Sequence, residues 1–149
     1  FMAAIMRFGQ ARLCPPSIEQ FACTALTEVP ASYLAGVNAE YQKRRDTVYA
    51  ALAAMPGVLV RRPEGAFYIC ARLPVDDSNA FAQWLLEDFA LDGETVMVAP
   101  ADGFYATPGL GRDEVRIAYV LEVPVLQRAM KCLAAALATY PGRIETAKV

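Results

Sequence analysis

Residues 94–121 constrain the fold of this chain more than any other stretch, because two strand-like runs enclose a long loop there. The runs cover residues 95–99 and 114–121. The second run alternates apolar residues at Val115, Ile117 and Tyr119, which is the pattern of a strand with one face on a hydrophobic core. The loop between the runs is rich in glycine and proline and too irregular for a tight hairpin. Long ordered loops between strands often carry function.

Arg116 stands in the middle of the second run, on the face opposite to the apolar residues. A period of two places it on one face with Glu114, Ala118 and Val120. Its planar guanidinium can bind a carboxylate through two parallel hydrogen bonds, which a lysine cannot do. On residue type alone, a surface ion pair with Glu114 is the more common use of such an arginine. Arg116 is therefore either a surface ion-pair partner or a binding residue for a carboxylate.

Apolar spacing and chain breakers predict five helices around these strands. We expect them at about residues 1–11, 17–29, 31–55, 78–89 and 124–140, each bounded by proline or glycine. Ser17 with Gln20 forms a capping-box pattern at the second helix, and residues 76–78 supply capping oxygens for the fourth. In the third helix the charged run at residues 42–46 predicts a solvated face, opposite to a buried stripe that includes Val48 and Leu52.

A hairpin is predicted between residues 58–62 and 66–73. Pro63 and Gly65 fit a four-residue type I turn between the two strands. Phe67 and Tyr68 begin the second strand, and their residue types alone favour core packing. Strands grouped with helices that pack on one face predict an α+β domain with a few-stranded sheet.

Composition excludes several classes of function. With 14 basic and 16 acidic residues, the net charge of −2 does not suggest a nucleic-acid partner. The chain has no histidine, and its four cysteines lie far apart, so neither a metal site nor a histidine triad is expected. We expect free, mostly buried thiols in a reducing compartment, listed as Cys14, Cys23, Cys70 and Cys132.

The sequence also predicts neither a membrane-spanning segment nor a signal peptide. No apolar run reaches the ~18–20 residues of a membrane span, and an arginine interrupts the apolar opening segment, unlike in a signal peptide. A cytoplasmic protein is the resulting expectation. The high hydrophobic fraction, 56%, favours a surface that further chain or a second subunit covers.

Four motifs in order resemble one enzyme family. They are GFYATPGLGRDEVRIAYVLE at 103–122, PEGAFYIC at 63–70, EYQKRRD at 40–46 and ARLCPPSIEQ at 11–20. Together they resemble the C-terminal portion of class I/II, fold-type I aminotransferases that use pyridoxal phosphate (PLP), the aspartate aminotransferase family. The resemblance covers essentially the whole chain.

This resemblance implies a domain organisation and a site. Residues 1–30 would be a remnant of the large cofactor-binding domain at a dimer interface, with residues 13–15 near the neighbouring subunit's active site. Residues 31–149 would be the small C-terminal domain, which starts with a long linking helix at 31–55. By resemblance Arg116 binds the substrate α-carboxylate, and Phe67 lies at the mouth of the active site. PLP, an amino acid and a 2-oxo acid would be the ligands of a homodimeric parent enzyme.

The family's Schiff-base lysine and the residues around its cofactor ring have no counterpart in this chain. Lys43, Lys131 and Lys148 fit outward helix positions or the C-terminal tail. The resemblance therefore implies no catalytic, cofactor-binding or metal-binding residue here, and an N-terminal large domain elsewhere. The chain alone is expected to be inactive.

Three functions stay open from the sequence. The first is transamination of the aspartate or alanine type, which the motifs favour. The second is another PLP reaction on the same fold, such as that of a lyase or a synthase, because Arg116 would serve it equally well. The third is a non-catalytic α+β module for ligand binding or oligomerisation, since fold does not fix function.

Overall fold

The structure of the chain is a computed structural model, and it describes residues 1–11 and 14–145. The chain divides into two compact units, Phe1–Val37 and Asn38–Val149. Each unit is described by itself. The expected boundary between a large-domain remnant at 1–30 and a small domain at 31–149 stays a prediction.

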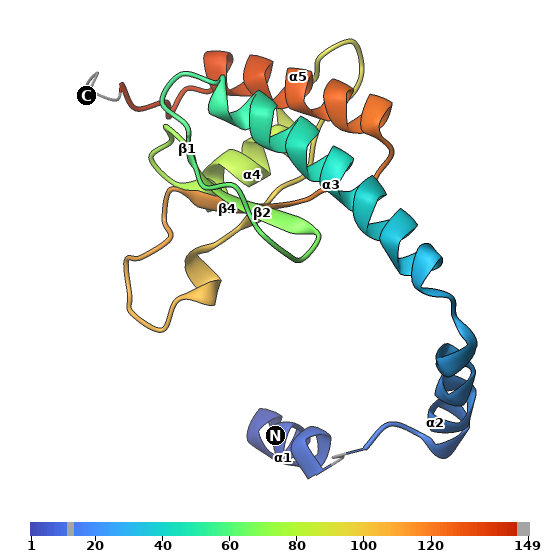
Figure 1. The fold of residues 1–149 in the computed structure, drawn as a ribbon. Helices are drawn as coiled ribbons and strands as arrows, with labels where there is room; N and C mark the ends of the chain where they lie inside the picture. Colours follow the sequence, from blue (N-terminus) through green and yellow to red (C-terminus); the bar gives the residue numbers. More distant parts are fainter. Residues whose placement is uncertain (12–13, 146–149) are drawn as a thin grey trace. The chain divides into compact units, whose positions relative to one another are not determined.

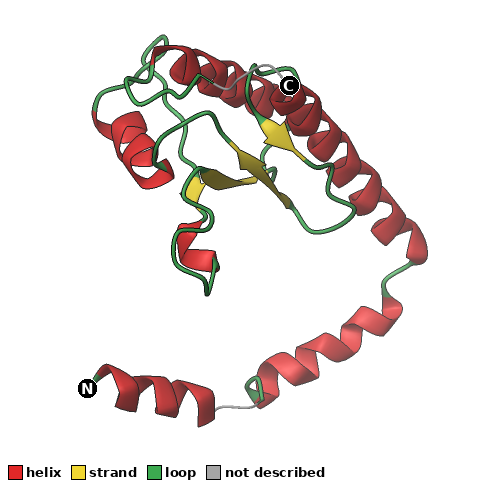
Figure 2. Ribbon diagram, turned by 90° about the vertical axis from the view of Figure 1, so that its left-hand side faces the viewer, coloured by secondary structure: helices red, strands yellow, loops and turns green. Residues whose placement is uncertain are grey.

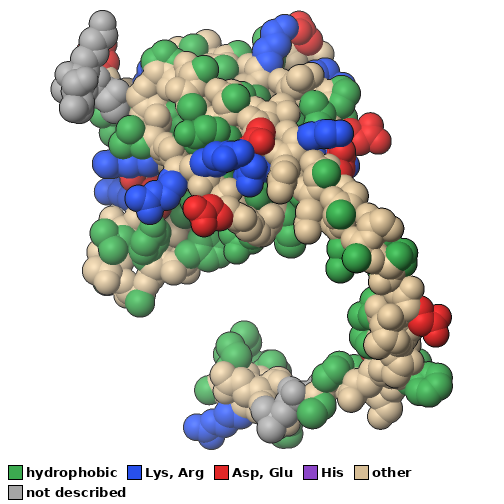
Figure 3. All heavy atoms as spheres, in the orientation of Figure 1, with side chains coloured by type: hydrophobic (Ala, Val, Ile, Leu, Met, Phe, Trp, Pro, Cys, Tyr) green, Lys and Arg blue, Asp and Glu red, His purple; other side chains and the backbone are tan. Residues whose placement is uncertain are grey.

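The first unit is helical. It contains α1 (Met2–Ala11), α2 (Ser17–Cys23), η1 (Thr24–Glu28) and the first turns of α3 (Ala31–Ala53). These positions confirm the predicted helices. None of the described residues of α1, α2 and η1 is buried. Figure 3 shows hydrophobic side chains on the surface of this unit, and Phe1, Phe8 and Phe21 are among the exposed ones.

The capping box predicted at Ser17 is wrong. Pro16 is the N-cap residue of α2, and no side chain caps the helix there. Pro16 has an extended ψ of 151°, so the helix can begin only after it, and Ser17 falls inside the first turn. Gln20 donates its side-chain amide hydrogen to the carbonyl of Pro15 instead, at 2.7 Å. The neighbouring residues Arg12 and Leu13 lie outside the described part of the chain.

The second unit is built on a four-stranded antiparallel sheet in the order β1-β2-β4-β3 (Figure 1). Its strands are β1 (Leu59–Val60), β2 (Tyr68–Arg72), β3 (Ala99–Pro100) and β4 (Glu114–Ala118). The C-terminal part of α3, α4 (Ser78–Glu87) and α5 (Val123–Thr139) supply the helices. Figures 1 and 2 show these helices on one side of the sheet, which confirms the α+β class.

One hydrophobic core joins the helices to that face of the sheet. Ile69 and Val115 are buried on β2 and β4, while their chain neighbours Tyr68 and Arg116 lie on the outer face. This alternation confirms the period of two read from the sequence. The predicted helical stripes are buried too, at Val48 and Leu52 of α3, Phe81 and Leu85 of α4, and Leu126, Met130, Leu133 and Leu137 of α5.

The N-terminus of α4 has the predicted cap. The side chain of Asp77 accepts hydrogen bonds from the backbone N–H groups of Asn79 (2.8 Å) and Ala80 (3.1 Å). The Ala80 bond is the main reason that the pKa of Asp77 is held below its ordinary range. The predicted first-turn proline of α5 is also confirmed, since Pro124 lies at the start of that helix.

The predicted four-residue turn between β1 and β2 is wrong. Pairing of these strands ends at Val60 with Ala71, so the connection runs from residue 61 to residue 67. Ala66, predicted to begin the second strand, instead has a left-handed backbone, with a φ of 62°. The loop leaves the sheet because its polar groups bond to α3: the Nη1 of Arg45 donates to the carbonyl of Pro63 at 3.4 Å.

The strand predicted at residues 95–99 is also shorter than expected. Only Ala99–Pro100 pairs with β4. The preceding residues alternate in burial, with Val98 at 8% and Met97 at 81% exposure, but they form no ladder. Thr95 donates its hydroxyl hydrogen to the carbonyl of Leu85 at 2.6 Å, so contacts with α4 hold this segment in place.

The solvated face predicted at residues 42–46 is wrong in part. Gln42 and Lys43 are exposed, but Arg44, Arg45 and Asp46 are half-buried. The Nη1 of Arg44 donates to the carbonyl of Val120 at 2.6 Å. These charges therefore bind other segments of the chain rather than water alone.

The thiols differ from the expectation of burial. The four cysteines are free, but only Cys132 is buried, and Cys14, Cys23 and Cys70 are exposed. Burial raises the pKa of the Cys132 thiol. No helix among the described residues is long and apolar enough to cross a membrane.

The core makes the stability of the second unit sensitive to alkaline pH. Tyr140 packs against Phe81 and Trp84, and its hydroxyl donates to Asp76 at 3.1 Å. Burial, followed by this hydrogen bond, raises the pKa of Tyr140 from 10.0 to about 12. The folded state therefore favours the neutral phenol, and the associated stability is full below pH 10 and is lost as the pH rises towards 12.

We predict that the free energy of unfolding falls between pH 10 and pH 12, and that it falls less in Tyr140→Phe. Urea titrations at a series of pH values, followed by the fluorescence of Trp84, would measure both slopes. Trp84 is the single tryptophan and contacts Tyr140 directly. Equal slopes in the two proteins would contradict the role of Tyr140.

Candidate functional site

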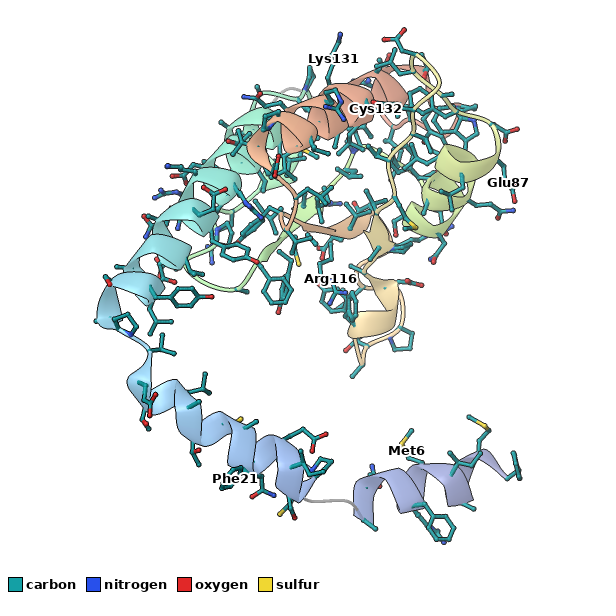
Figure 4. All side chains as sticks on the ribbon, turned by 90° about the vertical axis from the view of Figure 1, so that its right-hand side faces the viewer. Met6, Phe21, Glu87, Arg116, Lys131 and Cys132 are labelled. Atoms are coloured by element: carbon teal, nitrogen blue, oxygen red, sulfur yellow. The ribbon has the colours of Figure 1, made fainter. Side chains whose placement is uncertain are left out.

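Arg116 lies at the centre of the outer face of the sheet. Its register partners are Cys70 on β2 and Ala99 on β3. The alternation that buries Val115 and Ile117 against the helices places the Arg116 side chain on the opposite face. Figure 4 shows Arg116 on the side of the sheet away from Lys131 and Cys132 of α5, with aromatic rings beside it.

Two aromatic rings hold the guanidinium of Arg116. Its Cζ lies 5.2 Å from the centre of the Tyr68 ring and 4.8 Å from that of the Phe104 ring. Both distances fall within the range of a cation–π contact, about 6 Å. Tyr68 comes from the start of β2, and Phe104 from the short helix η2 (Asp102–Phe104) in the loop before β4. The rings contact the guanidinium while its N–H edge carries the hydrogen-bond donors.

The surface ion pair that residue type favoured for Arg116 does not form. No carboxylate of residues 1–11 or 14–145 makes an ion pair with it. Glu114 accepts a hydrogen bond from the hydroxyl of Tyr105 instead, at 2.5 Å. This leaves the carboxylate-binding interpretation of Arg116 consistent with the geometry.

The loop that carries Phe104 is fixed at several points. Tyr105 packs over Gly111, which has a φ of 73°, and a Cβ at that position would lie 2.5 Å from the ring of Tyr105. Further along, Arg112 forms an ion pair with Asp77 at 3.3 Å, and its carbonyl accepts from the N–H of Ser78 at 2.7 Å. The loop is thus attached to β4 on one side and to the start of α4 on the other.

Phe67 and Tyr68 are exposed rather than packed in the core, so that expectation is wrong. Their exposed fractions are 53% and 39%, because Tyr68 points to the outer face of β2 and Phe67 precedes the strand. The two rings meet edge to face, with centroids 5.7 Å apart. The role of Phe67 at the mouth of an active site stays a prediction.

The described lysines are exposed residues of two helices. Lys43 on α3 and Lys131 on α5 are both exposed, as expected, and Figure 4 shows Lys131 pointing outward from its helix. Lys148 lies outside the described residues. Within the part of the chain that the structure describes, no group of three or more His, Cys, Asp or Glu side chains could hold a metal ion.

The sequence analysis identified Arg116 but missed its aromatic partners. Tyr68 could have been found, since the period of two puts it on the same face as Arg116 once β2 and β4 pair. Phe104 carried no comparable signal, because its position depends on the path of an irregular loop. The same holds for Tyr105 and its bond to Glu114.

Comparison with known proteins identifies the fold. No family model matches the chain. Aspartate aminotransferase from Rhizobium meliloti strain 1021 is 34% identical over 140 residues, covering 86% of this chain and 32% of the relative. Aspartate aminotransferase from Bacillus subtilis strain 168 is 30% identical, over 78% of this chain and 29% of the relative. The solved alanine aminotransferase from Pyrococcus furiosus superposes with a TM-score of 0.68 at 28% identity, over 90% of this chain and 33% of that one.

The chain has the sequence and the fold of the C-terminal portion of fold-type I aminotransferases. A second solved structure, the aspartate aminotransferase of Rhizobium meliloti, agrees at a TM-score of 0.64 and 31% identity, over 86% of this chain and 32% of that one. The chain spans about a third of the length of the curated relatives that it matches.

The bond between Tyr105 and Glu114 can be tested by titration. The carboxylate of Glu114 raises the pKa of the Tyr105 phenol above 10.0, chiefly through their hydrogen bond. We predict that Glu114→Gln lowers the pKa of Tyr105 towards that value, measured by NMR of ¹³Cζ-labelled tyrosine. Glu94→Gln, which removes an exposed carboxylate paired with Arg128, is the control and should leave the pKa of Tyr105 unchanged. An unchanged midpoint in Glu114→Gln would show that this bond is absent in solution.

Proposed function

We propose that this chain forms part of a PLP-dependent aminotransferase and that Arg116 binds the α-carboxylate of its substrates. The observation that carries the proposal is the environment of Arg116. Its guanidinium is exposed on a strand paired on both sides, contacts two aromatic rings, and has no ion pair among the described residues. The names of the relatives add the class of reaction, since the proteins reported above are aspartate and alanine aminotransferases.

The geometry suits a molecule that presents a carboxylate. Rings on the guanidinium leave its N–H edge for two parallel bonds to the two carboxylate oxygens. They also exclude water from part of the group, which strengthens the pairing relative to one in bulk solvent. A carboxylate held at two points fixes the adjoining carbon in position, which lowers the entropic cost of the reaction. The amino acid and the 2-oxo acid of a transamination both carry this carboxylate, so one arginine serves both.

PLP, when bound, supplies an electron sink for the substrate carbon that gains or loses the amino group. Covalent attachment of PLP needs a lysine. The two described lysines are exposed on α3 and α5, and Figure 4 shows Lys131 on the side of the sheet away from Arg116. The described residues therefore do not fit the attachment of the cofactor. Under this proposal, the chain binds and orients the substrate, while an N-terminal large domain provides the lysine. The homodimer expected for such an enzyme is part of the same proposal.

Substitution of Arg116 in the complete enzyme tests this function. Arg116→Lys keeps the charge but loses the planar pair of donors, so it should weaken binding of amino acids without affecting binding of the cofactor. Arg116→Ala should cost more, about 3–5 kcal/mol in kcat/KM, the scale for removing one partner of a buried charge pair. The loss should be equal for every amino acid and for the 2-oxo acid. Steady-state kinetics in both directions measure it.

Arg128→Ala is the matched control. Arg128 is an exposed arginine on α5, and its ion pair with Glu94, at 3.6 Å, is exposed too. It should leave kcat/KM unchanged. If Arg116→Ala kept near-normal kcat/KM, or if its loss followed only a lower melting temperature, the proposed role would be wrong.

The 149-residue chain alone should not take up PLP covalently. Mixing it with PLP and recording the visible spectrum should give no stoichiometric band that disappears when one lysine is changed. Lys43→Arg and Lys131→Arg are the relevant variants, because both side chains are exposed. A stoichiometric band lost in one of them would place the cofactor lysine inside this chain and overturn its assignment to another domain.

A further inference from the structure

The charged run of α3 holds the loop that leads to the Arg116 site. The Oδ1 of Asp46 accepts hydrogen bonds from two arginines, Arg45 Nε at 2.9 Å and Arg62 Nη2 at 2.9 Å. Arg62 Nε adds a third bond to the same oxygen at 3.1 Å. Arg62 belongs to the loop after β1, so one carboxylate ties α3 to residues 61–67. We name Arg45, Asp46 and Arg62 the α3 clamp.

Arg45 is the most buried member of the α3 clamp, since the side chains of Asp46 and Arg62 are 48% and 54% exposed. The Arg45 side chain is 14% exposed although it is charged, and the hydrogen bond that it donates to Asp46 raises the pKa of Arg45. The same bond, followed by that from Arg62, lowers the pKa of Asp46. Arg45 also donates to the carbonyl of Pro63 at 3.4 Å, which gives the loop a second attachment to the helix.

The far end of the loop is attached to Tyr119, the residue that follows β4. The hydroxyl of Tyr119 donates to the carbonyl of Ala66 at 3.1 Å, and the N–H of Tyr119 donates to the carbonyl of Phe67 at 2.9 Å. Ala66 has a left-handed backbone, with a φ of 62°. Tyr68 follows at once, and its ring contacts the Arg116 guanidinium.

We infer that the α3 clamp positions Tyr68 against Arg116, so that Arg45, Asp46 and Arg62 are positioning residues for the carboxylate site. None of the three touches the substrate. They fix residues 61–67 between α3 and β4, and the loop in turn fixes the ring on one face of the guanidinium. Pairing with Ala118 fixes the backbone of Tyr68. Without the clamp, the preceding loop keeps its attachment to Tyr119 alone, and the Tyr68 ring is free to turn away from the guanidinium. The effect of the α3 clamp on substrate binding rests on the proposed function of Arg116.

A purely structural role would give a different result. No residue of the loop at 61–67 belongs to the hydrophobic core, and only Pro63 among them is half-buried. Loss of the clamp should therefore move the loop while it leaves the core and the melting temperature of the second unit nearly unchanged. The contact between Tyr68 and Arg116 is the readout that separates the two roles.

NMR of the chain measures that contact without any substrate. Ring currents from Tyr68 and Phe104, whose centres lie 5.2 Å and 4.8 Å from Cζ of Arg116, should shift the Arg116 side-chain protons upfield. In Asp46→Ala we expect the part due to Tyr68, obtained as the difference from Tyr68→Leu, to fall, because the ring moves away from the guanidinium. Arg62→Gln removes one arm of the clamp and should show a smaller change of the same sign. Glu94→Ala, which breaks an exposed ion pair with Arg128, is the control and should show none.

Two outcomes overturn the inference. One is an unchanged Arg116 shift in both Asp46→Ala and Arg62→Gln. The other is a shift that changes only together with a large fall in melting temperature, followed through Trp84 fluorescence, since that would mean general unfolding. Asp46→Glu, which keeps the carboxylate, should recover part of the shift if the clamp is electrostatic.

Kinetics of the complete enzyme extend the test to function. Asp46→Ala should raise KM for the amino acid and for the 2-oxo acid about three- to tenfold, the scale of one cation–π contact, with little change in kcat. In an Arg116→Ala background it should have no further effect. A lost ring-current shift with unchanged KM would contradict a role of the α3 clamp in substrate binding. Failure of the proposed function would appear instead as near-normal kcat/KM in Arg116→Ala, so the two proposals fail separately.

Discussion

Pairing of β2 with β4 is the interaction on which the rest of the second unit depends. The register that sets Ile69 opposite Ile117 buries both against the helices and brings Cys70 opposite Arg116 on the outer face. A slip of one residue would exchange the faces, burying Arg116 and exposing Ile117. The hydrophobic effect therefore fixes the register, and the register in turn places the Tyr68 ring within reach of the Arg116 guanidinium. The hydrophobic core and the candidate site thus lie on opposite faces of the same pair of strands.

Much of this fold follows from the sequence because its signals are local. The stripe of α5, the cap at Asp77 and the alternation along β4 each depend on residues within a few positions of one another, and each is confirmed. The failures share a different cause. The turn after β1 and the charged run of α3 depend on bonds such as Arg45 to Pro63 and Arg44 to Val120, which join residues far apart in the chain. No local pattern indicates that a backbone carbonyl will accept from a distant arginine.

The candidate site divides in the same way. Arg116 was found from its residue type, its place on the strand and the resemblance of its motif. Its partners were not, and the pair with Glu114 that residue type alone favours does not form among the described residues. An exposed ion pair between side chains gains little, and the hydroxyl of Tyr105 forms a short bond to Glu114. Phe104 reaches Arg116 only because the loop is held by Tyr105, Gly111 and Arg112, a set of contacts with no signature in the sequence.

The choice of aromatic neighbours has a consequence for an arginine that binds a ligand. A guanidinium paired with a carboxylate of its own protein would have to exchange that partner for the carboxylate of the substrate, with little net gain. Aromatic faces hold the group in place and leave its charge and its N–H edge for the ligand. This recognition extends only to the carboxylate that all amino and 2-oxo acids share. Under the proposed function, Arg116 thus sets the class of substrate, and selection among side chains rests with other groups in the enzyme.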